Sequence, residues 1–434
     1  MNRKILQLTL PNIVTNVTVP LVGMIDIAIA GRVNADLALG AVAIGSAIFN
    51  FIYWNFGFLR MGTTGFAAQA YGARNLREAT NVLIRGCCVA LFISAILLIF
   101  QLPLGRFSLW IMQGSPEVMQ LAKEYFFIRI WAAPATIGLY AFKGWFIGMQ
   151  NPRSPMVIAI IVCVVNFICG VWFVFGMNMG IVGIALSTVI AQYCGLLSAI
   201  GFCIKYYHKL SKYINIHKAL QWNSLKLYFS VNGNIFIRTL CLVSVFTFFT
   251  SASSGMGNEL LAVNTLLMQL FTLYSYIMDG FAYAGESLIG KFVGNNNLPM
   301  IRKCVSYLML WGIVMGTLFT LIYAVSWRPV LSIFTDDWNI INLAGDFLWW
   351  ILAVPLVGFT AFIYDGILTG ATRTDVMRNA IIIAAAAFFI IYYSLKPILS
   401  NDALWVAFLT FLILRGALQA LSVKGYKVIK EAHL

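Results

Sequence analysis

The stretch IVTNVTVPLVGMIDIAIA, residues 13–30, decides the fold class of this chain. Apart from one acid, Asp26, it reads as part of a helix that crosses a membrane, which takes roughly 20 mostly apolar residues. A carboxylate near the centre of such a helix costs about 2.5–3.5 kcal/mol to insert. We therefore expect a membrane protein in which the charge state of Asp26 is used.

The composition of the whole chain agrees with this expectation. Of its 434 residues 61% are hydrophobic and 10% are charged, with a mean hydropathy of +0.86, whereas soluble domains are about 45–50% apolar and about 25% charged. Twelve apolar segments are long enough to cross a bilayer: 5–31, 41–70, 78–101, 118–148, 155–176, 180–206, 223–251, 259–290, 301–325, 343–371, 376–395 and 402–423. The sequence therefore predicts an all-α polytopic membrane protein with twelve transmembrane helices. Almost no chain is left for a soluble domain.

The formal net charge of +14 raises the question of nucleic-acid binding, but the distribution of the charge argues against it. If the N-terminus is cytoplasmic, most Lys and Arg residues fall in cytoplasmic connections, including Lys424, Lys427 and Lys430 in the tail. The opposite side carries Arg32, Arg106, Lys123, Arg328 and Lys396. This positive-inside pattern predicts that both termini are cytoplasmic, and we expect no nucleic-acid partner.

The two halves of the chain repeat each other in a constant register. YGARN at residues 71–75 matches VGNNN at residues 293–297, so that Gly72 falls on Gly294. The same register relates Gly144 to Gly366 and Gly148 to Gly370. Because six spans is an even number, the halves have the same orientation, as in transporters with parallel repeats.

This repeat predicts two pseudo-symmetric six-helix bundles with a cleft between them. We place the N-lobe at residues 1–206, a cytoplasmic connecting loop at 207–222 and the C-lobe at 223–434. Parallel repeats of this kind predict transport by rocking one lobe against the other.

Three polar residues of the N-lobe fall in one layer. Counting 1.5 Å per helical residue places Asp26, Asn166 and Thr188 each roughly 9–15 Å inside the outer boundary. Their oxygens suit a proton, a hard cation such as Na⁺, or a cationic ligand. The simpler alternatives are helix-packing hydrogen bonds for Asn166 and Thr188 and a structural role for Asp26. Pro11 and Pro20 on the same helix as Asp26 predict a bend, either static or part of a switch.

The C-lobe carries a different set of polar residues, Arg238, Asp279, Glu286 and Asp365. Arg238 and Asp279 lie at similar depths, so we expect a buried ion pair between them. The N-lobe has Arg60 and Lys143 at the matching levels. We hypothesise that these cations meet the C-lobe acids when the cleft closes on the inside.

No catalytic constellation, phosphate-binding loop or metal-ligand spacing is present in the sequence. The eight cysteines show no framework spacing. The sequence therefore predicts no enzyme, no metal and no cofactor. An ion gradient, H⁺ or Na⁺, is the expected energy source rather than ATP.

Several segments resemble one known family. PNI at 11–13 and TVPLVG at 18–23, followed by Asp26, resemble the first helix of the multidrug and toxic compound extrusion (MATE) transporters, in particular the DinF-like branch. FLRMGTTGFAAQAYG at 58–72 is similar to the second helix of that branch. DGFAYA at 279–284 and DG, GATR and MRN within 365–379 are similar to its eighth, tenth and eleventh helices. The resemblance covers essentially the whole chain.

The resemblance implies a V-shaped pair of bundles in a bacterial inner membrane, expected to be monomeric. It also implies export of organic cations and amphipathic compounds against inward H⁺ or Na⁺. In relatives the first-helix aspartate is the coupling residue and its helix bends at a proline matching Pro11. Asp26, Asn166 and Thr188 correspond to the cation site of the first lobe.

Two departures from the family pattern bear on these expectations. Gly170 stands where close relatives often have a second aspartate, four residues after Asn166. A single carboxylate holds Na⁺ less well, so we favour H⁺ as the coupling ion while Na⁺ stays open. Asn234 stands where relatives tend to have an aspartate, which favours the pairing of Arg238 with Asp279.

The sequence supports other functions less well. A flippase for lipid-linked saccharides, as in related branches of the superfamily, is the main alternative, since Arg60, Lys143 and Arg238 suit a pyrophosphate head group. A membrane-embedded enzyme or a channel is disfavoured, because the sequence has no catalytic constellation and no repeated filter segment.

Overall fold

A computed structural model describes residues 1–32, 35–112 and 114–423. The tail residues Lys424, Lys427 and Lys430 of the predicted charge pattern lie outside the described residues. Within the described part the regular structure is helical throughout.

The described residues of the first half form thirteen helices and helical turns. They are α1 (Asn2–Ala30), α2 (Ala35–Asn55), α3 (Phe58–Gly72), α4 (Leu76–Ile99), α5 (Gln101–Ile111), α6 (Pro116–Arg129), η1 (Ile130–Ala132), α7 (Ala133–Gly148), α8 (Arg153–Val171), η2 (Trp172–Gly176), α9 (Gly180–Tyr207), η3 (His208–Tyr213) and α10 (Ile216–Ala219).

The second half, as far as the structure describes it, consists of seven helices. They are α11 (Trp222–Ser254), α12 (Asn258–Gly294), α13 (Leu298–Leu331), α14 (Trp338–Asp346), α15 (Leu348–Gly370), α16 (Thr374–Leu399) and α17 (Asn401–Val423).

The predicted number of membrane-crossing segments is confirmed. In the described residues, 12 helical segments are long and apolar enough to cross a membrane. α2 and α3 together form one of them, Leu37–Gly72, and α5 and α14 lie outside these segments. The predicted segment 343–371 is divided in the structure, because the backbone at Phe347 (φ −102°, ψ 5°) separates α14 from α15.

The internal repeat is visible in the closest helix contacts. α7 lies so near α3 that a Cβ atom on Gly144 would overlap the carbonyl oxygen of Arg60. α15 approaches α12 in the same way, since a Cβ atom on Gly366 would overlap the carbonyl oxygen of Ala282. The register that places Gly144 on Gly366 also places Arg60 on Ala282, so the second contact repeats the first. The glycines let paired helix backbones touch, as small residues do between membrane helices.

The turns after these helices repeat as well. Arg74 and Asn296 are matching positions of the two halves, and both adopt a positive φ, 56° and 51°. An asparagine follows each of them and caps the next helix. The side chain of Asn75 accepts a backbone N–H from three residues later at 3.0 Å, and that of Asn297 does so at 3.1 Å. Duplicated sequence therefore produces duplicated backbone geometry.

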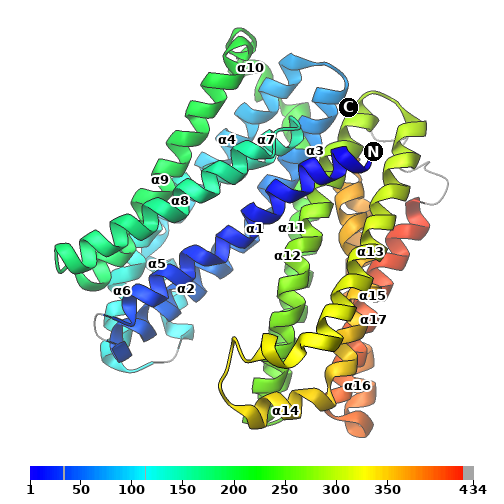
Figure 1. The fold of residues 1–434 in the computed structure, drawn as a ribbon. Coiled ribbons are helices and arrows are strands. Elements are labelled where there is room, and N and C mark those ends of the chain that lie inside the picture. The colour runs from blue at the N-terminus through cyan, green and yellow to red at the C-terminus, as the bar shows by residue number, and fades with distance from the viewer. Residues whose placement is uncertain (33–34, 113, 424–434) are drawn as a thin grey trace. The chain divides into compact units, whose positions relative to one another are not determined.

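The chain divides into two compact units. The first unit is Leu10–Tyr228; the second unit is Met1–Thr9 together with the chain from Phe229 onward. In the first unit α3 packs on α4 and α7, α8 packs on α9, and α6 contacts α2 and α9. In the second unit α12, α13, α15 and α17 lie side by side (Figure 1). The lobe boundaries predicted from the sequence, 1–206, 207–222 and 223–434, stay a prediction.

Candidate functional site

The helix that carries Asp26 contains both predicted prolines. Pro11 and Pro20 lie inside α1, where a proline removes one backbone hydrogen bond and crowds the preceding turn. Between them the hydroxyl of Thr15 donates to the carbonyl of Pro11 at 2.9 Å, and Thr18 bonds a carbonyl one turn earlier. Back-bonded threonines favour bending of a helix. The segment of α1 before Asp26 is therefore the part of this helix that bends most readily.

Asp26 is fully buried (0% exposed) and its carboxylate is enclosed by donors from three other helices. Asn166 on α8 donates from Nδ2 to Oδ1 at 3.1 Å, and Thr188 on α9 donates to Oδ2 at 3.0 Å. The hydroxyl of Tyr125 on α6 lies 3.4 Å from Oδ2 and donates to it. The structure thus brings together the three residues that the sequence placed in one layer.

Arg129, the cation nearest to Asp26, was not predicted from the sequence. Its Nη1 lies 3.8 Å from Oδ2 of Asp26, donates to the hydroxyl of Ser46 at 3.1 Å and also donates to the hydroxyl of Tyr125. The guanidinium lies 5.2 Å from the ring centroid of Phe49, within cation–π range. An arginine inside a predicted span, four residues after a tyrosine on the same helix face, was the available signal.

Two buried polar atoms beside Asp26 have no hydrogen-bond partner among the described residues. They are Oδ1 of Asn166 and Nε of Arg129. The amide of Asn166 gives its Nδ2 to Asp26, to Thr188 at 3.2 Å and to Ser187 at 3.5 Å. The site therefore holds one spare acceptor and one spare donor.

The position of Gly170, where relatives often have a second aspartate, is tightly packed. A Cβ atom there would lie 2.7 Å from Cδ1 of Ile29 and 3.5 Å from Oγ of Ser187. A carboxylate at this position requires Ile29 to move. The single acid at the site therefore agrees with the local packing of α8 against α1.

The acid of the second unit has different partners. Asp365 on α15 accepts from Nε of Arg238 at 2.9 Å and from the guanidinium of Arg415 on α17. Gln419 donates to its other oxygen at 2.7 Å. The predicted pairing of Arg238 with Asp279 was wrong as to the partner, because equal depth does not fix which helix faces α11. Arg415 was not predicted as a partner of Asp365.

The remaining predicted residues of the second unit are spread over several contacts. Asp279 is half-buried and close enough to Arg415 for their charges to interact. Glu286 is buried on α12, where its carbonyl oxygen faces Gly370. Asn234, which replaces an aspartate of relatives, accepts from Arg378 at 2.8 Å.

Arg60 and Lys143 lie on α3 and α7 of the first unit, the pair of helices in close contact. Their charges are near enough to repel each other. Their predicted meeting with acids of the C-lobe stays a prediction.

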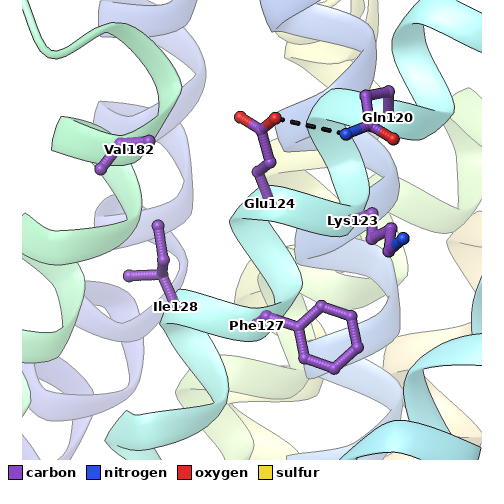
Figure 2. Close-up of a pocket in the computed structure, with 6 residues that line it drawn as sticks. All are labelled: Gln120, Lys123, Glu124, Phe127, Ile128 and Val182. Carbon is purple, nitrogen blue, oxygen red and sulfur yellow. Dashed lines mark hydrogen bonds between the residues drawn. The ribbon is translucent and has the colours of Figure 1, made fainter.

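A surface groove of about 340 Å³ lies on the first unit between α6 and α9. It is lined by Gln120, Lys123, Glu124, Phe127, Ile128 and Val182 (Figure 2). The amide of Gln120 donates to Glu124 at 3.4 Å inside the groove. Tyr125 and Arg129 on the same helix are not part of this lining, so the groove and the Asp26 site use different faces of α6.

Comparison with known proteins places this geometry in context. The MatE family model matches the chain over residues 11–172 and 235–395. The chain is 33% identical over 411 residues to DNA damage-inducible protein F of Escherichia coli K12, covering 94% of this chain and 89% of the relative. It is 22% identical to the probable multidrug resistance protein NorM of Synechocystis sp., over 69% and 66%. The bent form of the Vibrio cholerae MATE transporter VcmN matches the structure with a TM-score of 0.86 at 17% identity, covering 99% of this chain and 97% of that one.

Proposed function

Because this chain belongs to the MatE family of transporters, we propose that it is a secondary antiporter that exports cationic and amphipathic small molecules. The inward ion in this proposal is H⁺, bound at Asp26. As a family member it is a membrane transporter with twelve spans and not an enzyme. It is related to DNA damage-inducible protein F and to the probable multidrug resistance protein NorM named above.

The observation that carries the proposal is the enclosure of Asp26. A fully buried carboxylate with three neutral donors and one cation is set apart from solvent, yet each of its bonds favours the charged form. Adding a proton removes the charge that holds Asn166 and Thr188 to α1. Protonation therefore weakens the links between α1 and the helices α8 and α9.

Once these hydrogen bonds are weakened, α1 bends in the segment that carries its two prolines. With Asp26 neutral, α1 is free to bend between Pro11 and Pro20, and the space available to cargo shrinks. A ligand shifts such an equilibrium only by its difference in affinity between the two states. Exchange follows because the proton and a cationic substrate favour opposite states of Asp26.

The finer setting of the protein is part of the same proposal. We place it in the bacterial inner membrane as a monomer with both termini cytoplasmic, supported by the positive-inside distribution of Lys and Arg. The natural cargo is expected to be an organic cation or an amphipathic compound of small size.

Efflux of a fluorescent cation from proteoliposomes tests the proposal, with a pH gradient and a Na⁺ gradient imposed separately. We expect an inward proton gradient to drive export. Absence of export under both gradients, with transfer of a lipid-linked saccharide in its place, would overturn the antiporter in favour of a flippase.

A further inference from the structure

We propose that Arg129 is a tethered counter-cation that makes the Asp26 site selective for protons over metal ions. This inference rests on the proposed antiport at Asp26 and concerns the choice of ion. It assigns a specificity-determining role to a residue that the family resemblance did not bring forward.

The first step is the charge balance around Asp26. The groups that face it are Tyr125 and Arg129 from α6, Asn166 from α8 and Thr188 from α9. Among the described residues, Arg129 is the cation that forms an ion pair with Asp26, at 3.8 Å. When Asp26 is ionised, the charges of its carboxylate and of the guanidinium sum to zero.

Among the side chains that the structure describes, the other acids of the first unit do not restore a negative charge here. Glu78 pairs with Arg85 at 3.3 Å, and Glu117 and Glu124 are exposed. Position 170 is a glycine and supplies no carboxylate, and an acid there would require Ile29 to move. Among the described side chains the site therefore has one acid, Asp26, and the charge of Arg129 already balances it.

The second step is the effect of that guanidinium on a metal ion. A Na⁺ coordinated by Oδ2 of Asp26 would share this oxygen with a cation 3.8 Å away. Like charges about 4 Å apart at an effective dielectric constant of about 20 repel enough to weaken binding roughly a thousandfold. Arg129 thus places a positive charge beside the oxygen that a coordinated cation would use.

The same guanidinium charge also opposes protonation of Asp26, but a proton becomes an O–H bond of the carboxyl group and needs no shell of oxygen ligands, whereas a metal ion does. The neutral carboxyl needs an acceptor for its O–H, and Oδ1 of Asn166 is a buried acceptor without a partner among the described residues. Rotation of that amide presents Oδ1 to Asp26 in place of Nδ2. Arg129 meanwhile keeps its hydrogen bonds to the hydroxyls of Ser46 and Tyr125 and its cation–π contact with Phe49.

Direct Na⁺ binding to purified protein, measured with radioactive Na⁺, tests this proposal without any transport step. We expect no saturable binding by the wild-type protein and at least about 100-fold tighter binding by Arg129→Gln, which keeps a donor for Ser46 but removes the charge. Arg129→Lys should restore exclusion of Na⁺. Arg106→Gln is the matched control, because Arg106 is an exposed arginine of the same unit, and it should behave as wild type.

Two outcomes would overturn the proposal. One is saturable Na⁺ binding by the wild type that Asp26→Asn abolishes, a measurement that also decides the matter if Arg129→Gln does not fold. The other is a folded Arg129→Gln protein that binds no more Na⁺ than wild type. Failure of antiport itself is seen separately, as absent dye efflux under a pH gradient.

Discussion

Asp26 in the first unit and Asp365 in the second are both buried acids on largely apolar helices, but their partners differ. Asp26 has one arginine at 3.8 Å and three neutral donors. Asp365 is bonded directly to two arginines and a glutamine. We therefore propose that the same residue type exchanges a proton in the first unit and holds helices together in the second.

The difference lies in what protonation leaves behind. Protonating Asp26 leaves one buried guanidinium, that of Arg129, which still donates hydrogen bonds to a serine and a tyrosine hydroxyl and lies over an aromatic ring. Protonating Asp365 would leave Arg238 and Arg415 facing each other without the charge that joins them. We therefore assign proton exchange to the first unit and a structural role to the ion cluster of the second.

The largest expected effect is on transport. Asp26→Asn should reduce dye efflux driven by a pH gradient to the level of protein-free liposomes, because the variant cannot exchange a proton at this site. Folded Asp365→Asn protein should still respond to the gradient. Equal efflux by wild type and Asp26→Asn would remove the basis of the comparison.

For stability we expect the larger effect at Asp365 and the smaller one at Asp26. Asp365→Asn should destabilise the protein by about 3–5 kcal/mol, because breaking a buried ion pair leaves an uncompensated charge. Unfolding in detergent, followed by denaturant titration, measures this loss. Asp346→Asn is the control, since Asp346 is exposed at the end of α14. A structural role for Asp365 is excluded if the two variants unfold alike.

The repeated glycine contacts should respond equally in both units. Gly144→Ala and Gly366→Ala should each cost about 1–3 kcal/mol, because the added methyl group overpacks a helix crossing. Gly201→Ala and Gly233→Ala are controls in α9 and α11, where a Cβ atom meets nothing within 4 Å. They should be neutral or stabilising by up to about 1 kcal/mol. A loss confined to one unit would argue against equivalent packing in the two repeats.

The smallest expected effect concerns a single hydrogen bond to Asp26. Side-chain hydrogen bonds between membrane helices average about 0.6 kcal/mol, so Thr188→Val should change the concentration of protons giving half-maximal efflux by about threefold. Thr188→Ser keeps the hydroxyl and should match wild type. A pH profile of efflux distinguishes the two variants, and an unchanged profile for Thr188→Val would remove Thr188 from the site.

Much of the fold could be predicted because length, hydropathy and repetition are properties of the sequence alone. The twelve spans follow from apolar length, and the constant register between the two halves anticipates the paired contacts of Gly144 and Gly366. Depth counted along a helix also placed Asp26, Asn166 and Thr188 in one layer. Depth and repetition can both be counted along the sequence without knowing how the helices pack.

The rest of the site depends on which helix face meets which neighbour, and this is set by packing in three dimensions. Depth put Arg238 level with Asp279, yet α11 presents Arg238 to Asp365 on α15. The ion pair of Arg129 with Asp26 was not predicted, because the two residues are distant in the chain and no sequence pattern pairs their helices, α6 and α1.

The central claim is that Asp26 gives up a proton when cargo binds, and proton release from the purified protein tests it most directly. Adding a fluorescent organic cation to weakly buffered protein should release on the order of one proton per bound dye, by linkage of binding to protonation. The release should vanish in Asp26→Asn and persist in folded Asp365→Asn. Equal proton release by wild type and Asp26→Asn would contradict the account.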